Sequence, residues 1–388
     1  AAGGDGVARD EGRVTFVPRT APGDVVRVQL TQQTKSFARG RLVEIVTSSP
    51  SRVTPPCPAF ERGCGGCAWM HVSRAEQLAA KQAVVAGALR KLAGLTLHPI
   101  ADPAPALGWR RRARFHVQNG RLGLYRESSH DVLPIDSCPQ LEPALDAKLF
   151  ELAGQSALAE GYRAADRDAD FAATTGNAGA WMPDGEVVML RGIRGDVAVG
   201  IGQRSANDPL VEIEPGLWGT AWDFAQASES GNKKLIELAR AALGTSSTGA
   251  PLLELYAGAG NLTRGFIADG WNVLASDVIA PMKKPDVDAA RFEYRTGAAD
   301  GIVERVIAEK RAFDAVVLDP PRAGAAEAID GIIAIVPRVI VYVSCDPATL
   351  ARDAERLVAA GYRATDAWPV DLMPQTSHVE VVLRLERA

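Results

Sequence analysis

The second half of the chain alternates short apolar strands with segments of helical pattern, and this alternation limits the possible folds more than any other feature. The expected strands are 252–256, 272–276, 315–318 and 339–343, and the expected helices are 233–243, the segment after Gly260, and 348–360. Strands that alternate with helices in this way form a parallel, doubly wound sheet. We therefore predict an α/β domain over residues 223–388, with a ligand at the carboxyl ends of its strands.

Polar residues stand where these strands end. The first strand runs into Gly258 and Gly260, and glycines let a ligand approach the backbone closely. Thr263 occupies the place of the third glycine in a dinucleotide fingerprint, which argues against a nicotinamide cofactor. Glu254 and Asp277 suit a zwitterionic nucleoside such as S-adenosylmethionine, with Asp277 on the ribose hydroxyls. Asp319, at the end of a further strand, should face the same ligand.

A single cysteine follows the last of these strands. Cys345 precedes Asp346 and Pro347, which are typical of the first positions of a helix. The partial positive charge of a helix N-terminus stabilises a thiolate, so we expect a lowered pKa for Cys345 and a catalytic role beside Asp319. Farther along, His378 and Glu380 share one face of a predicted strand.

The other cysteines indicate a metal centre. Cys57, Cys64 and Cys67 lie close together in a glycine-containing loop, and Cys138 follows at a distance with a proline after it. Three clustered thiols plus a distant one match iron–sulfur ligation better than the paired motifs of zinc sites, although zinc stays the alternative. A disulfide framework is not expected in a chain of this size with an odd number of cysteines.

The first part of the chain has a different residue pattern. Alternating segments at 14–17, 26–30 and 42–46 predict a small β-barrel over residues 1–47, of the kind that binds RNA. Residues 48–222 should form a central, mostly β domain with the metal site and a helix at 74–92 that packs on the catalytic domain. A basic strand there begins at Arg110 and continues through Arg111, Arg112 and Arg114.

The charge is unevenly distributed between these regions. Residues 1–130 contain 19 Lys and Arg against 9 Asp and Glu, whereas the remainder contains 24 against 38. A basic front on an acidic body favours a polyanionic partner such as nucleic acid. No run of about 18 uncharged apolar residues occurs, which argues against a membrane-spanning helix, and we expect a cytoplasmic protein.

Several motifs together resemble the RNA uracil-5 methyltransferase family, in particular its 23S ribosomal RNA branch, which has an N-terminal TRAM barrel and a 4Fe–4S cluster. The resemblance runs over essentially the whole chain. It rests on the four clustered and distant cysteines and on the segments 109–114, 224–226, 255–261, 319–324, 344–353 and 378–380. The Ser-Cys-Asp-Pro run at 344–347 with Ala-Thr-Leu-Ala-Arg-Asp after it is the most specific of these. The sequence departs from the family pattern at Ser228, Thr296 and Gln375 and in a first cysteine spacing that is longer.

The resemblance implies a class I methyltransferase sheet and a role for each matching residue. Cys345 would be the nucleophile and Glu380 the general base. The remaining residues with implied roles are Gln226, Tyr256, Gly258, Gly260, Asn261, Asp277 and Asp319 for S-adenosylmethionine or substrate, Cys57, Cys64, Cys67 and Cys138 for the cluster, and Arg110, Arg111, Arg112, Arg114, Lys35 and Arg39 for RNA. The implied substrate is an unstacked uridine in a loop of 23S ribosomal RNA, and the implied enzyme is a monomer.

Three alternatives stay open at this point. The same chemistry could act on a tRNA uridine. The chain could also be an iron–sulfur oxidoreductase, which the incomplete glycine fingerprint opposes. A non-catalytic iron–sulfur RNA-binding protein is the third, and the presence of both Cys345 and Glu380 argues against it.

Overall fold

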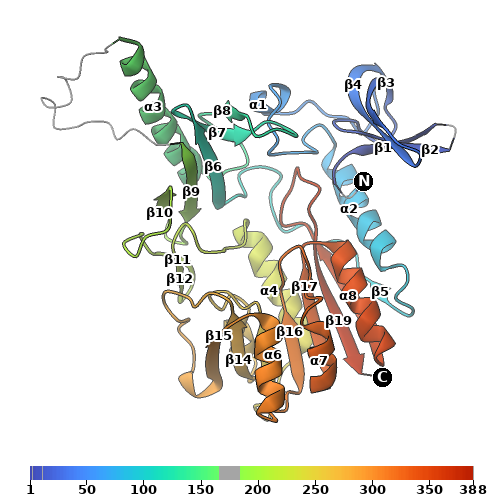
Figure 1. The fold of residues 1–388 in the computed structure, drawn as a ribbon, viewed down its shortest axis with the longest axis vertical. Helices are drawn as coiled ribbons and strands as arrows, with labels where there is room; N and C mark the ends of the chain where they lie inside the picture. The colour runs from blue at the N-terminus through green and yellow to red at the C-terminus, as the bar shows by residue number, and fades with distance from the viewer. Residues whose placement is uncertain (2, 11, 166–183, 388) are drawn as a thin grey trace, which may run out of the picture.

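The computed structural model describes residues 1, 3–10, 12–165 and 184–387, and three sheet-containing regions succeed one another through the molecule (Figure 1). A four-stranded sheet at the N-terminus and a five-stranded central sheet lie at one end. An eight-stranded sheet formed mainly by the second half of the chain lies at the other end. Residues 166–183, inside the predicted central domain, lie outside the described residues.

The N-terminal sheet has the order β1-β2-β4-β3. Its strands are β1 (Gly6–Asp10), β2 (Arg13–Val17), β3 (Val25–Gln33) and β4 (Phe37–Thr47). Three of them contain the predicted strands, and β1 was not predicted. β1 and β3 are the two edges of this sheet, and no strand pairing joins them in the described part of the chain, so the predicted small β-barrel is open between these strands.

The central region is built on a sheet with the order β10-β9-β6-β7-β8. Its elements are α1 (Pro58–Glu61), β6 (Arg112–Gln118), β7 (Arg121–Tyr125), β8 (Val132–Pro134), α3 (Pro143–Ala165), β9 (Gly185–Arg191), β10 (Val197–Ile201), β11 (Val211–Glu214) and β12 (Leu217–Gly219). The β9–β10 hairpin and the strand after Arg110 agree with the sequence pattern. The long helix α3 corrects the expectation of a mostly β region: its Leu145 and Leu149 side chains are fully buried in the core beside the cysteine loop.

The large sheet has the order β15-β14-β13-β16-β17-β19-β18-β5, as predicted for a doubly wound α/β domain. Its strands are β5 (Thr96–Leu97), β13 (Pro251–Leu255), β14 (Asn272–Asp277), β15 (Phe292–Thr296), β16 (Ala315–Leu318), β17 (Val339–Ser344), β18 (Tyr362–Val370) and β19 (Glu380–Arg387). β13 to β17 pair in parallel, and β19 runs antiparallel to β17. The amino end of β19 therefore lies at the same edge as the carboxyl ends of its parallel neighbours.

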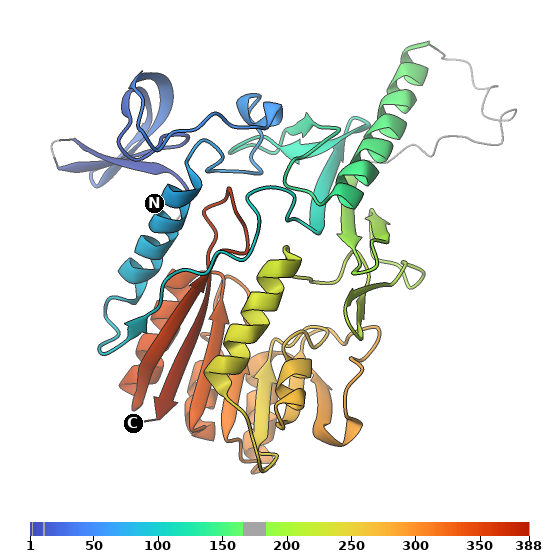
Figure 2. The same ribbon diagram turned by 180° about the vertical axis from the view of Figure 1, so that it is seen from behind.

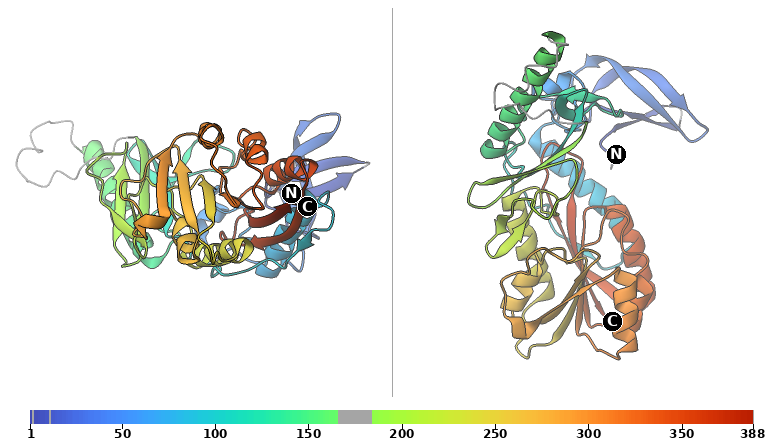
Figure 3. Two further views of the ribbon diagram at one scale, coloured as in Figure 1. Left: turned by 90° about the horizontal axis from the view of Figure 1, so that it is seen from below. Right: turned by 60° about the vertical axis from the view of Figure 1, so that its left-hand side comes forward.

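Helices cover both faces of this sheet (Figure 3). They are α2 (Arg74–Leu89), α4 (Glu229–Leu243), α5 (Thr263–Ala268), α6 (Ala299–Ala308), α7 (Ile329–Ile335) and α8 (Pro347–Ala359), with a short 3-10 turn, η2, at Ala289–Arg291. α4 and α5 pack into one apolar cluster, and α2, α6, α7 and α8 into another on the opposite face. α8 begins as predicted, because the Asp346 carboxylate accepts hydrogen bonds from the amides of Ala348 and Thr349 at 2.9 and 3.0 Å.

Residues from far upstream in the chain also pack on the large sheet and pair with it. Val85 and Leu89 of α2 are buried in the same apolar cluster as α8, and β5 pairs with β18 at the sheet edge (Figure 2). The predicted helix at 74–92 thus packs on the C-terminal sheet. By packing and pairing, residues 74–97 belong with the C-terminal sheet rather than with the central one.

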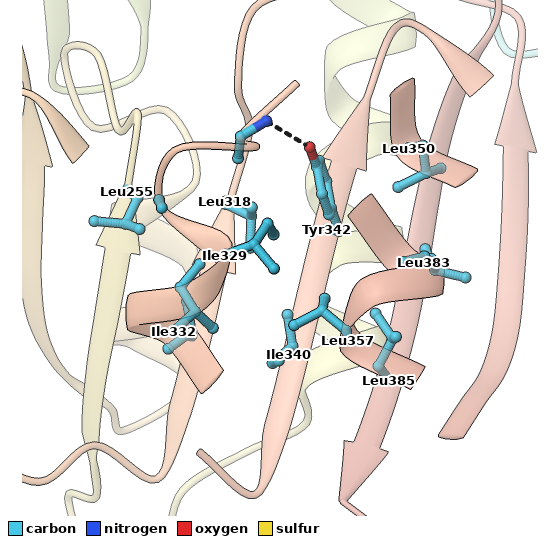
Figure 4. Close-up of a cluster of buried hydrophobic side chains, with 14 of the residues drawn as sticks. Leu255, Leu318, Ile329, Ile332, Ile340, Tyr342, Leu350, Leu357, Leu383 and Leu385 are labelled. Atoms are coloured by element: carbon cyan, nitrogen blue, oxygen red, sulfur yellow. Dashed lines mark hydrogen bonds between the residues drawn. The ribbon is translucent and has the colours of Figure 1, made fainter. Parts of the chain in front are cut away.

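A buried hydrogen-bond network at Tyr342 ties the loop after Arg322 to α8, and Figure 4 shows the hydrogen bond that the Tyr342 hydroxyl accepts from the Ala325 amide at 3.1 Å. The Tyr342 hydroxyl donates to Asp353 of α8 at 2.8 Å, and the amide of Ala325 donates to the same carboxylate oxygen at 2.9 Å. Asp353 ends the Ala-Thr-Leu-Ala-Arg-Asp segment that makes the sequence so specific. Its side chain therefore fixes the loop after Arg322 against the helix that follows Cys345.

Candidate active site at one edge of the large sheet

Cys345 and Glu380 meet at the edge of the sheet where the parallel strands end. The last pair in the register of β17 with β19 joins Ser344 to Val381. Cys345 is the next residue of one strand and Glu380 the preceding residue of the other, so the two stand opposite each other. Asp319 follows β16, the other neighbour of β17, at the same edge.

Burial and mutual repulsion set the protonation of these groups. Desolvation raises the pKa of Glu380 to about 8, with Asp319 adding to the shift and Arg322 opposing it. Desolvation likewise raises the pKa of Asp319 to about 7. Burial, followed by the charge of Glu380, raises the pKa of the Cys345 thiol to about 11. The expected lowering of the Cys345 pKa by the helix N-terminus is therefore wrong, because desolvation and the two acids outweigh the helix.

Two further side chains, the cation Arg322 and the uncharged imidazole of His378, lie beside these groups. Arg322 Nη2 lies 3.1 Å from His378 Nε2. Burial, followed by the charge of Arg322, lowers the pKa of His378 to about 4, so its ring is uncharged at neutral pH. Arg322 is the cation that lowers the pKa of both Cys345 and Glu380.

The glycine loop after β13 lies beside this group. Gly258 and Gly260 have φ angles of 55° and 97°, in the region that favours glycine. A side chain at Gly258 would meet nothing within 4 Å, so the backbone there faces open space. The Gly258 amide donates to Asp277 Oδ2 at 2.9 Å, which ties the loop to the end of β14. Tyr256, just before the loop, donates its hydroxyl to Glu327 Oε1 at 2.7 Å.

A further acid lies under the loop. Glu254 is buried in β13 and accepts a 2.6 Å hydrogen bond from the hydroxyl of Thr263. Desolvation raises its pKa to about 8, and Asp319 contributes in the same direction. Thr263, the residue that breaks the dinucleotide fingerprint, thus holds this carboxylate. Glu254, Asp319 and Glu380 form an acidic wall along the sheet edge.

The predicted RNA contact at Arg111 is wrong. This side chain is only 1% exposed and donates to the carbonyls of Gln226 and Ile213 at 3.1 and 3.0 Å and to Glu214 at 2.6 Å. Its guanidinium is therefore occupied by protein acceptors. Through them it holds the backbone of Gln226, one of the predicted ligand contacts.

The same network reaches the glycine loop. Glu214 also accepts from Asn232 of α4 at 2.6 Å, and Asn232 exchanges two side-chain hydrogen bonds with Asn261 at 2.9 and 2.8 Å. Asn261 is thus oriented by α4. Ser228, one of the departures from the family pattern, caps that helix by accepting from the Gly231 amide at 3.1 Å.

The other predicted RNA residues differ in exposure. Arg114 is exposed and pairs with Glu186 at 3.1 Å, and the half-buried Arg112 donates to the carbonyl of Asp223 at 3.1 Å. Arg110 lies over the Trp109 ring at 5.0 Å. On the N-terminal sheet, Lys35 and Arg39 are both exposed, and Arg39 pairs with Asp5 at 3.1 Å.

All four predicted cluster ligands line one cavity. Cys57, Cys64, Cys67 and Cys138 surround it together with apolar side chains. Desolvation raises the pKa of Cys67 to about 12, with the neighbouring Cys138 adding to the shift. In the described part of the chain, no three or more His, Cys, Asp or Glu side chains come together as ligands for one metal ion.

The loop between β18 and β19 joins this cavity to the sheet edge, a connection that sequence reasoning missed. Thr376 lines the cysteine cavity, and Glu380 begins β19 a few residues later. The Trp69 amide, just after Cys67, donates to the Gln375 carbonyl at 3.0 Å, and the Gln375 side chain accepts from Gln77 of α2 at 2.8 Å. No helix in the described residues is long and apolar enough to cross a membrane.

Comparison with known proteins gives consistent matches. Two family models match, the TRAM domain over residues 2–43 and the tRNA (Uracil-5-)-methyltransferase over residues 302–388. An uncharacterized RNA methyltransferase of Gloeobacter violaceus is 34% identical over 100% of this chain and 95% of its own. The 23S rRNA (uracil(1939)-C(5))-methyltransferase RlmD of Marinomonas sp. is 33% identical, over 98% and 92%, and that of Pectobacterium atrosepticum is 31% identical, over 97% and 90%.

A solved structure shares the whole fold. The Pyrococcus abyssi tRNA (uracil-54, C5)-methyltransferase, in complex with S-adenosyl-L-homocysteine, superposes with a TM-score of 0.68. The superposition covers 98% of this chain and 97% of that one, at 21% identity. An N-terminal TRAM domain and a class I methyltransferase sheet are thus confirmed.

Proposed function

The chain belongs to the family of RNA (uracil-C5)-methyltransferases, and from that premise we propose that it methylates carbon 5 of a uridine in 23S ribosomal RNA with S-adenosylmethionine as donor. The observation that carries the proposal is the register that sets Cys345 opposite Glu380 at the ligand edge of the sheet. A thiol and a carboxylate in contact with one substrate ring are what this chemistry requires.

The glycine loop and the acidic wall suit the methyl donor. The open backbone at Gly258 accommodates a nucleoside, and Asp277 has a carboxylate at the end of β14 for its ribose hydroxyls. The sulfonium and ammonium groups of S-adenosylmethionine carry positive charge. Their binding would stabilise the ionised forms of Glu254 and Asp319, whose pKa values burial raises in the unliganded protein.

Cys345 starts the reaction because carbon 5 of uracil is a poor nucleophile. Its thiolate forms a bond to carbon 6, and the electron pair displaced from the 5,6 double bond makes carbon 5 nucleophilic. Carbon 5 then forms a bond to the methyl carbon of S-adenosylmethionine, while the bond between that carbon and the sulfonium sulfur breaks and S-adenosylhomocysteine leaves. Glu380 accepts the proton from carbon 5, the double bond re-forms, and the bond between Cys345 and carbon 6 breaks.

Arg322 balances the negative charges that arise during these reaction steps. It is the cation that lowers the pKa of both the Glu380 carboxyl group and the Cys345 thiol, and its guanidinium is oriented by the contact with the uncharged ring of His378. We assign to Arg322 the stabilisation of the negative charge that develops on the uracil ring when the thiolate adds.

The substrate must present an unstacked base, since a uridine inside a helix cannot reach a half-buried thiol. The exposed Arg114, Arg39 and Lys35, together with the TRAM domain, supply positive charge for the phosphates. The relatives named for 23S ribosomal RNA favour that substrate over tRNA. We also propose that the protein is a monomer and works in the cytoplasm, where ribosomal RNA is found.

We further propose that Cys57, Cys64, Cys67 and Cys138 hold a 4Fe–4S cluster. The donor set fits it: four soft thiols line one largely apolar cavity, and the Gly66 amide already donates to Cys64 Sγ at 3.4 Å. Three thiols close together in the sequence and a distant fourth favour this cluster over zinc, whose sites are typically built from paired motifs. Methyl transfer needs no electron, so the cluster would fix the loop to Cys138 and shape the RNA-binding region.

The proposed substrate can be tested by mapping 5-methyluridine in all RNA from cells that lack this protein and from cells that regain it. We expect one or more 23S ribosomal uridines to lose methylation and to recover it with the wild-type protein but not with Cys345→Ala. Loss confined to tRNA would support the alternative substrate. An unchanged pattern, with tight RNA binding by the purified protein, would support a non-catalytic RNA-binding protein.

A further inference from the structure

The walls of the cysteine cavity contain polar side-chain atoms without partners. Among the described residues, nine buried side-chain nitrogen and oxygen atoms have no hydrogen-bond partner. Four of the nine belong to residues that line this cavity, namely Trp109 Nε1, Arg110 Nε, and both amide atoms of Gln140. Trp109 and Gln140 are each only 2% exposed.

Such atoms need an explanation, because native proteins rarely leave buried N–H groups unpaired. Backbone groups around them do have hydrogen-bond partners. The Arg110 amide donates to the Gln140 carbonyl at 2.8 Å, and the Leu141 amide donates to the Cys138 carbonyl at 2.9 Å. These bonds fix the segment of Trp109 beside the segment of Cys138. The unpaired donors are thus held at the cavity wall by an ordered backbone.

Three of the four atoms are nitrogens that lack an acceptor, whereas Gln140 Oε1 lacks a donor. An acceptor bound in the cavity that these residues line would supply the partner of the nitrogens. The chemistry of the site limits what it can be, since the other polar side chains at the wall are the four thiols and the hydroxyls of Ser137 and Thr376, and the charge of Arg110 is positive. An anionic group rich in sulfur, with both thiolate and sulfide acceptors, would match three N–H donors and a cation. A neutral occupant such as water could accept hydrogen bonds from the donors but would leave the charge of Arg110 uncompensated, and a cationic one would repel it.

We propose that Trp109 and Gln140, with Arg110, donate hydrogen bonds to the sulfur atoms of the bound iron–sulfur cluster and thereby raise its reduction potential. This inference rests on the proposed cluster and goes beyond it by naming residues that are not its ligands. Hydrogen bonds to the sulfurs stabilise the more negative, reduced state, and they are one of the means by which proteins set the potential of a cluster.

The test is a potentiometric titration of the anaerobically purified, cluster-containing protein, followed by electron paramagnetic resonance. Trp109→Phe and Gln140→Leu remove the donors and keep most of the side-chain volume. We expect each variant to retain the wild-type iron content and to show a more negative midpoint potential. Trp222→Phe is the matched control, because Trp222 Nε1 is also buried without a partner but does not line the cavity, and its midpoint should equal that of the wild type.

Equal midpoints in the wild type and in both cavity variants would overturn the inference. If the variants do not retain a cluster, resonance Raman spectra of the wild-type protein in H2O and D2O decide the matter. Iron–sulfur bands that shift on exchange support hydrogen bonds to sulfur, and bands that do not shift refute them. A wild-type protein without iron and sulfide would instead refute the proposed cluster itself, so the two failures are distinguishable.

Discussion

At the residue scale, the main question is how a thiol with a pKa raised to about 11 becomes a nucleophile. Its neighbour Glu380 has a pKa raised to about 8, so near neutral pH both groups are mostly protonated in the unliganded protein. The positive sulfonium of the donor and the guanidinium of Arg322 both favour the ionised forms. Substrate binding would therefore activate Cys345, and the free enzyme would keep an unreactive thiol.

These protonation states predict a pH dependence. A carboxyl group whose pKa is raised is protonated below that pKa, so the base form of Glu380 is lost as the pH falls through about 8. Cys345, whose pKa is raised to about 11, stays a thiol in the free enzyme across this range and ionises only after the substrate binds, so Glu380 sets the slope of the profile. We expect kcat/KM, which reports the free enzyme, to rise by about tenfold per pH unit between pH 6 and 7.5. A profile that is flat from pH 6 to 8 would contradict the assignment of these groups.

At the scale of elements, the sequence predicts helices and strands best where the local pattern and the burial agree. The buried strands β13, β14, β16 and β17 follow directly from short apolar runs, and the cap at Asp346 follows from its residue type. The helix α3 had a readable signal, since Leu145, Leu149 and Leu152 repeat at helical spacing and are buried. The surrounding segments have a strand pattern, which masks this signal in the sequence.

Other contacts cannot be predicted from the local sequence pattern. Nothing around Arg111 distinguishes it from its neighbours in a basic run, and only the fold shows that it is buried against Glu214 and Gln226. Likewise the ion pair between Lys81 and Asp371 joins residues far apart in the chain. The opposition of Cys345 and Glu380 depends on the register between two strands, which no single segment specifies.

The ion pair of α2 gives a prediction about stability. Lys81 Nζ lies 2.7 Å from Asp371 Oδ1, and both side chains are fully buried. Lys81→Met would leave Asp371 with Arg74 as its remaining cation, so we expect a loss of about 3 kcal/mol in the free energy of unfolding, measured with urea. Lys91→Met, which breaks an exposed 3.1 Å pair with Glu355, is the control and should cost less than about 1 kcal/mol. Equal effects of the two substitutions would contradict this account of how α2 is held.

At the scale of the whole molecule, the cysteine loop lies where three parts of the chain meet. Arg19 of the N-terminal region donates to the Phe60 carbonyl at 2.6 Å, the Gly65 amide donates to the carbonyl of Tyr125 at 3.0 Å, and Trp69 contacts the loop before Glu380. A metal centre here would order the TRAM domain, the central sheet and the loop leading to the base together. The basic residues proposed for RNA lie on the first two of these parts.

This arrangement predicts how RNA binding depends on salt. The exposed Arg39 and Arg114 lie on different sheets, and each would contact a phosphate. We expect Arg39→Ala and Arg114→Ala each to reduce the slope of log K against log salt by about 1, with little effect on the choice of sequence. The control is Arg338→Ala, which removes an exposed arginine paired with Asp314 on the acidic part of the chain. A slope that falls equally in all three variants would argue against a defined RNA-binding face.

The most direct test of the central claim is mass spectrometry of the Glu380→Gln variant after incubation with 23S ribosomal RNA and S-adenosylmethionine. Without the carboxylate the proton at carbon 5 cannot leave, so the bond to carbon 6 should persist. We predict a nucleotide cross-linked to the peptide that contains Cys345, with one added methyl group on the ring. Release of methylated RNA at the wild-type rate without such a cross-link, or a cross-link to a different residue, would contradict the mechanism.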